Sequence, residues 1–264
     1  MLGKLFKYDF KWIINKAMIV YFAISIFFAV VTKFVETLEM TVIVTIIDKI
    51  LVGILISCFF STFITCLIRI WVRFNVNIYK DESYLTHTLP VTKAKIFKSK
   101  MLVSYLTIIL TMLVILGCIA LVFLNESTVS YIKDLFNEGK VLLGEETLIG
   151  MIIAVVVIVI LEVFFMMQCG IFGLVLGNRA NNLKMAKSVL ISLMIYGMIS
   201  GLSLVILYII SRFNPTIMEL YSTNIPSTDA FKQLIYISLG IYFVYNIMLY
   251  FGSKKLLEKG VNVD

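Results

Sequence analysis

The sequence predicts an all-α integral membrane protein with six transmembrane helices, and two observations carry this prediction. Hydrophobic residues make up 61% of the 264 residues, charged residues only 15%, and the mean hydropathy is +1.01. A soluble domain has about a quarter of its residues charged, so lipid must be the solvent for most of this surface. The apolar runs are also continuous over about 20 residues, whereas strands of a membrane barrel alternate apolar and polar residues over about 10. We therefore expect helical spans.

The elements follow in order along the chain. The opening residues 1–11, MLGKLFKYDFK, set apolar side chains against three lysines and predict an amphipathic helix at the lipid interface; a disordered basic leader is the alternative. The first apolar run lacks a small-residue cleavage site and is expected to be a retained span. Six spans are predicted: Trp12–Thr32, Ile50–Ile68, Met101–Leu124, Leu148–Leu176, Ser188–Ser211 and Leu234–Gly252.

The distribution of charge predicts which side of the membrane each connection occupies. Segments 1–16, 69–100, 178–187 and 253–264 hold 17 of the 23 Lys and Arg residues, and the connections on the opposite side hold six. This asymmetry predicts cytoplasmic termini and a cytoplasmic loop at 73–100. The net charge of +7 then reflects topology and gives no reason to propose a nucleic-acid partner. The longest outer connection, 125–147, has room for a short amphipathic turn around Tyr131–Phe136.

Motifs for intrinsic catalysis are missing from the sequence. It contains no phosphate-cradling G-x-x-x-x-G-K-[ST] loop, no G-x-S-x-G elbow and no H-E-x-x-H pair. His87 is the only histidine, which excludes a multi-histidine metal site. The four cysteines lie in apolar runs without C-x-x-C spacing, so we expect small buried side chains without a metal or disulfide role: Cys58, Cys66, Cys118 and Cys169. We expect no enzyme activity and no cofactor in this chain.

The densest polar run of the sequence, IYKDESYLTHTLPVTKAKIFKSK, lies between the second and third spans. Nothing in the sequence interrupts a helix that leaves the membrane at Arg73 until Pro90, which disfavours helical backbone at Leu89. Thr92 is a suitable N-cap for the next helix, starting at Lys93. We therefore expect a helix, a tight corner and a second helix.

This loop has more features than a connector requires. Asp81 and Glu82 form an acidic pair on a basic side of the membrane, and Tyr79 and Tyr84 flank them. The pattern favours a surface that a partner protein binds; an ordinary solvated loop is the alternative.

The run RFxxxxYxDExYLTHTLPVTKxxIxxSK, from Arg73 to Lys100, resembles the signature of ABC-2-type permeases, the membrane subunits of ATP-binding-cassette exporters from Gram-positive bacteria. The two ends of the chain, MLGKLFKYDFK and KKLLEKGVNVD, are also similar to that group. The resemblance implies an N-terminal interfacial helix, a coupling helix over residues 78–92, and a plasma-membrane location. It also implies a separate dimeric ATPase subunit, which would hold ATP and Mg²⁺, and a second copy of this chain or a related permease. The residues expected to contact the ATPase are Tyr79, Asp81, Glu82, Tyr84, His87, Leu89 and Pro90.

Glu162 lies near the middle of the fourth predicted span, where an acid costs about 2.5–3.5 kcal/mol and usually faces protein or water. Met166 and Cys169 follow on the same helical face. One interpretation is that these residues line a translocation route or a subunit interface. The other is a protonated carboxyl that is hydrogen-bonded to Tyr242 or Asn246.

Two G-x-x-x-G pairs predict close helix packing, within the chain or between subunits. The pairs are Gly173 with Gly177 and Gly197 with Gly201. The leading function is that of an exporter's permease; a carrier or channel without a motor, and a membrane anchor or sensor, are the alternatives. Peptides, lantibiotics, lipids and drugs all remain open as substrates.

Overall fold

The computed structural model describes residues 2–39, 41–88, 90–180, 182–222 and 227–259, which form ten helices and no strand. Six of these helices are long and apolar enough to cross a membrane: α2 (Lys16–Glu36), α3 (Val42–Tyr79), α5 (Lys93–Phe123), α7 (Glu145–Gly177), α8 (Lys184–Phe213) and α10 (Thr228–Glu258). Many large apolar side chains on these helices face outward, as expected where lipid is the solvent. The chain is therefore an all-helical, multi-pass membrane protein.

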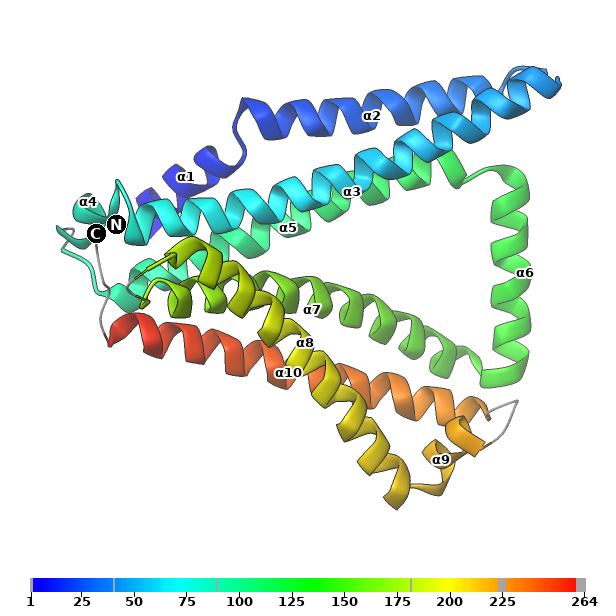
Figure 1. Cartoon of the computed structure of the whole chain (residues 1–264). Coiled ribbons are helices and arrows are strands. Elements are labelled where there is room, and N and C mark those ends of the chain that lie inside the picture. The colour runs from blue at the N-terminus through cyan, green and yellow to red at the C-terminus, as the bar shows by residue number, and fades with distance from the viewer. Residues whose placement is uncertain (1, 40, 89, 181, 223–226, 260–264) are drawn as a thin grey trace. The chain divides into compact units, whose positions relative to one another are not determined.

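The chain divides into two compact units, residues 1–134 and 135–264. In unit 1, α1 (Leu2–Ile13) contacts α3 and α5, while α2 contacts both of the same long helices (Figure 1). The short helix α4 (Ser83–Thr88) contacts α3. A hydroxyl contact of 3.0 Å between Ser25 and Thr62 joins α2 to α3. Nearby, a small apolar core is formed by Ala29, Leu55, Cys118 and Val122.

In unit 2, α7 contacts both α8 and α10. The short helix α9 (Pro215–Ser222) contacts α8 and α10. The apolar core consists of Phe165, Cys169, Tyr245 and Leu249. Phe165 is fully surrounded, with Tyr242 edge-on at a centroid distance of 6.0 Å. This unit is assembled from aromatic and small side chains of three long helices.

The helices differ from the expected elements in three places. Trp12 belongs to α1, because the backbone breaks at Ile14 and Asn15, and the Asn15 side chain accepts a hydrogen bond of 3.0 Å from the backbone of Ala17 and caps α2. The helix that contains the second expected span, α3, begins at Val42, eight residues before Ile50. The connection after α5 holds an 18-residue helix, α6 (Glu126–Leu143), instead of a short turn.

Candidate functional site

The connection between α3 and α5 contains a corner that we call the α4 corner, residues 80–92. The helix expected to run unbroken from Arg73 to Leu89 is interrupted: α3 ends at Tyr79, and α4 begins at Ser83. The backbone turns between them, with Ser83 N donating to Lys80 O at 2.7 Å. At this break the Glu82 side chain turns back to Arg73 and Asn77 of α3. Thr92 has the extended backbone of an N-cap before Lys93, but its side chain makes no capping hydrogen bond.

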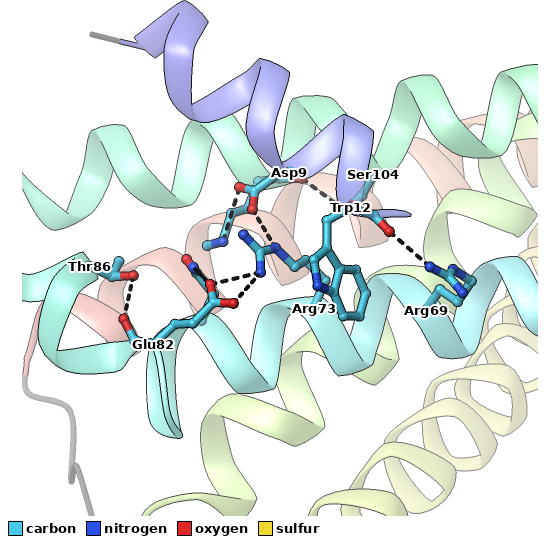
Figure 2. Close-up of polar contacts among 9 residues, drawn as sticks. Asp9, Trp12, Arg69, Arg73, Glu82, Thr86 and Ser104 are labelled. Atoms are coloured by element: carbon cyan, nitrogen blue, oxygen red, sulfur yellow. Dashed lines mark hydrogen bonds and ion pairs between the residues drawn. The ribbon is translucent and has the colours of Figure 1, made fainter. Parts of the chain in front are cut away.

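Four charged residues form a cluster beside this corner, the Arg73 cluster: Asp9, Arg73, Glu82 and Lys100 (Figure 2). Arg73 Nε donates to Asp9 Oδ1 at 2.7 Å, and its Nη1 donates to both Glu82 carboxylate oxygens at 2.9 and 2.8 Å. Lys100 Nζ donates to Asp9 Oδ2 at 3.1 Å. Asp9, Arg73 and Lys100 are buried, so each charge is compensated by a partner of opposite sign.

The cluster fastens α1 to the longer helices. Asp9 comes from α1 and binds one cation on α3 and one on α5. The Trp12 ring lies against the guanidinium groups of Arg73 and Arg69. Its centroid is 5.2 Å from Arg73 Cζ and 5.3 Å from Arg69 Cζ. Arg69 also donates to the last carbonyls of α1, from Nε to Ile13 O and from Nη2 to Trp12 O, both at 2.8 Å. Arg69 thus caps the C-terminus of α1, where a cation is favourable.

Glu82 fixes the α4 corner to the same cluster. Burial alone would raise the pKa of its carboxyl, but hydrogen bonds from Asn77 and Arg73 and the nearby positive charges outweigh burial and lower the pKa. Asn77 Nδ2 donates to Glu82 Oε2 at 2.8 Å, and Thr86 Oγ1 donates to Glu82 O at 3.0 Å (Figure 2). Arg73 is therefore the shared partner of α1 and the α4 corner.

The predicted contact residues divide into an inward and an outward set. Tyr79 is buried and so is not available on an exposed docking face, which corrects the prediction for this residue. Glu82 is paired with Arg73, but its side chain remains 38% exposed. Tyr84 is 76% exposed and its neighbour Leu85 is 66% exposed. Asp81 and Pro90 are also exposed. His87 lies in α4 but its side chain is outside the described part of the structure, and Leu89 lies outside the described residues.

Sequence reasoning missed Asp9, Arg73 and Lys100 as a unit. Their partners are 64 and 91 residues apart along the chain, which no local pattern reveals. One signal was present: at 100° per residue Asp9 falls among the apolar side chains of α1, opposite Lys4 and Lys7. An acid on the apolar face of a helix indicates a buried cationic partner.

The predicted site in the fourth span lies in unit 2. Glu162 and Met166 are half-buried on α7, while Cys169 is part of the apolar core. The side chain of Tyr242 on α10 interacts with Glu162, and this contact is compatible with both interpretations. The hydrogen bonds of the Asn246 side chain go to Gln168 and to two backbone carbonyls.

Asn246 and Gln168 form a buried amide pair between α10 and α7. Gln168 Nε2 donates to Asn246 Oδ1 at 2.8 Å. Asn246 Nδ2 donates to Leu161 O on α7 at 2.9 Å and to Tyr242 O on its own helix at 2.8 Å. These bonds hold the two helices in register without any charge.

The two glycine pairs have different surroundings. A Cβ on Gly173 would lie 2.7 Å from Ser192 N, and one on Gly177 would lie 2.5 Å from Ser188 Cα. Both glycines therefore allow the backbones of α7 and α8 to approach closely. Gly197 and Gly201 on α8 have no described atom within 4 Å of such a Cβ, so they make no close contact in this unit.

Among the described residues, no group of three or more His, Cys, Asp or Glu side chains could hold a metal ion. The described sites therefore provide ion pairs, an exposed apolar corner and helix contacts, and they contain no assembled set of acid, base and nucleophile. Compared with protein-family models, with curated proteins and with solved structures, the chain gives no match.

Proposed function

We propose that this chain is the permease subunit of an ATP-binding-cassette exporter in a bacterial plasma membrane. Its termini and the α4 corner are cytoplasmic, and a separate dimeric ATPase, which holds ATP and Mg²⁺, binds the corner. A second copy or a related permease completes the pore. The resemblance of residues 73–100 to ABC-2-type permeases supports the proposal, as do the six helices long enough to cross a membrane.

The observation that carries the proposal is the construction of the α4 corner. Its outer side exposes Tyr84 and Leu85, an aromatic and an aliphatic side chain that a soluble partner would cover. On its inner side, Glu82 forms an ion pair with Arg73 of α3, and Arg73 is buried against α1, where it pairs with Asp9. A partner that moves such a corner would move the attached helices with it, as a rigid body.

Co-purification tests the docking of an ATPase. The chain is extracted from its native membrane with mild detergent, and a bound ATPase is detected by mass spectrometry and by ATP hydrolysis. We expect Tyr84→Glu to abolish ATPase recovery without changing thermal stability. Tyr8→Glu is the matched control, because Tyr8 is a tyrosine that is 71% exposed on α1 and does not belong to the corner.

Equal ATPase recovery with both variants would reject the corner as the docking site. Failure of the unaltered chain to retain any ATPase, together with transport in vesicles that lack ATP, would favour a carrier or channel. Retention of an ATPase without ATP-dependent transport would favour an anchor or sensor.

A further inference from the structure

Helix α6 connects the third and fourth membrane-spanning helices and has no buried residue. At 100° per residue its side chains separate into two faces. The polar face carries Ser130, Lys133, Asp134, Asn137, Glu138 and Lys140. The apolar face carries Tyr131, Ile132, Leu135, Phe136, Leu142 and Leu143.

Both ends of α6 are fixed close to membrane spans. Only Leu124 and Asn125 separate it from α5, and only Gly144, at a φ of +78°, separates it from α7. Eighteen residues of helix are about 27 Å long, whereas one or two linking residues reach at most about 7 Å. Because α5 is apolar up to Phe123 and α7 is apolar from Leu148, the short linkers keep both ends of α6 close to the bilayer surface.

Polar contacts hold each end at the boundary of the spans. In unit 1, the Asn125 side chain binds both Lys33 and Glu36 at the end of α2, and these two form an ion pair at 3.1 Å. In unit 2, Lys140 pairs with Glu145 in the first turn of α7 at 2.8 Å. Such polar clusters at span ends mark the level where hydrocarbon gives way to water.

One contact shows which way the apolar face points. Gly139 lies in the middle of that face, and a Cβ there would lie 3.1 Å from the Leu148 side chain of α7. The apolar face of α6 is thus turned toward the apolar part of the span that follows it. The side chains on this face are nevertheless exposed to their surroundings, Tyr131 at 64% and Leu135 at 49%.

We propose that α6 lies flat in the membrane interface, between the last residues of α5 and the first residues of α7, with its apolar face inserted among lipid acyl chains. The partner is the bilayer itself. The helix carries three acids and two lysines, so insertion is driven by burial of apolar surface and does not require anionic headgroups. This inference uses the six spans only and is independent of the transport function.

Tryptophan fluorescence in reconstituted vesicles tests the proposal with a matched pair of positions. Leu135→Trp places the probe on the apolar face. Val141→Trp places it on the polar face, where Val141 is an apolar residue that is 87% exposed. The full chain is reconstituted into phosphatidylcholine with or without brominated acyl chains, with iodide on both sides of the membrane as the aqueous quencher. The signal of the unaltered chain, which has two tryptophans, is subtracted.

We expect emission from Leu135→Trp to shift to shorter wavelength, to be quenched by brominated chains and to be protected from iodide. Val141→Trp is expected to show the reverse pattern. Replacement of half the lipid by phosphatidylglycerol should leave both patterns unchanged.

Quenching of Leu135→Trp by iodide would place the apolar face in water and overturn the proposal. Protection from both quenchers would show that protein covers this face, which also overturns it. A requirement for phosphatidylglycerol would overturn the apolar basis of insertion. Ile132→Trp is a second probe on the same face, and circular dichroism confirms that each variant keeps its helix content. Because the experiment needs no ATPase, its failure and the failure of the transport proposal are distinguishable.

Discussion

Polar side chains join helices in both units, but the Arg73 cluster of unit 1 is charged and the Gln168–Asn246 pair of unit 2 is neutral. The Arg73 cluster lies where α3 and α5 meet α1 and the α4 corner, outside the longest apolar runs. The amide pair lies within the apolar runs of α7 and α10. A charge within hydrocarbon costs several kcal/mol, whereas an amide bonded to another amide costs much less. The contact between α7 and α10 inside the spans therefore relies on neutral amides, whereas the contacts of α1 with α3 and α5 rely on charges.

The largest expected effect comes from breaking the charged side of this comparison. Arg73→Leu leaves the buried Asp9 with Lys100 alone and leaves Glu82 with Asn77, and we expect a loss of about 3–5 kcal/mol in the free energy of unfolding. Thermal unfolding of the purified chain in detergent measures it. Arg212→Leu is the control: Arg212 is an exposed arginine that stacks on Tyr208 at 5.4 Å, and its loss should cost less than about 1 kcal/mol. Equal effects would show that the cluster contributes no special stability.

The close approach of α7 and α8 in unit 2 is tested by adding one methyl group to a glycine. Gly177→Ala would place a Cβ 2.5 Å from the backbone of Ser188, and such overpacking is expected to cost about 1–3 kcal/mol. Gly201→Ala adds the same atom in open space and should be neutral or stabilising by up to about 1 kcal/mol. Thermal unfolding of the two variants gives the comparison. Destabilisation by Gly201→Ala would contradict it and would indicate a contact with another subunit.

The neutral pair should contribute less than the charged cluster. Asn246→Leu is expected to cost about 0.6–1.7 kcal/mol, the range for hydrogen bonds between membrane helices. A double-mutant cycle with Gln168→Leu isolates the amide contact, and the coupling should be unchanged by added salt. Additive effects of the two substitutions would show that Gln168 and Asn246 do not stabilise one another.

The smallest expected effect is on pH dependence at the exposed edge of the Arg73 cluster. Because the pKa of Glu82 is lowered in the folded chain, its contribution is fully present above the pKa of an unfolded glutamate, about 4.3, and is lost as pH falls through the lowered value. At neutral pH the unaltered chain should therefore melt at a higher temperature than Glu82→Gln, which corresponds to a difference of less than about 1 kcal/mol in the free energy of unfolding. The difference should vanish in acid.

Asp81→Asn is the control for this measurement, because it removes the same charge from an exposed position next to Glu82. A pH-dependent loss of the same size in Asp81→Asn would mean that overall charge, and not the contact with Arg73, causes the effect.

The six spans could be predicted because composition and run length suffice for them. The interruption between Tyr79 and Ser83 could not be predicted from the sequence. At this point Glu82 contacts Arg73, which is itself paired with the distant Asp9, and no local pattern reveals that pairing. The glycine pairs show the same limit. Both have the same spacing, yet a second helix approaches closely only at Gly173 and Gly177 within the described structure. A motif permits close approach, but the partner helix must come from the tertiary fold.

The continuity of α3 has a mechanical consequence. Its 38 residues correspond to about 57 Å of helix, nearly twice the thickness of the hydrocarbon core, and they include one glycine and no proline. Such a helix is a lever arm without a proline hinge. A rotation of about 5° around its midpoint would displace each end by about 2.5 Å. A movement of the Tyr79 end of α3 would therefore also displace the Val42 end of the same helix.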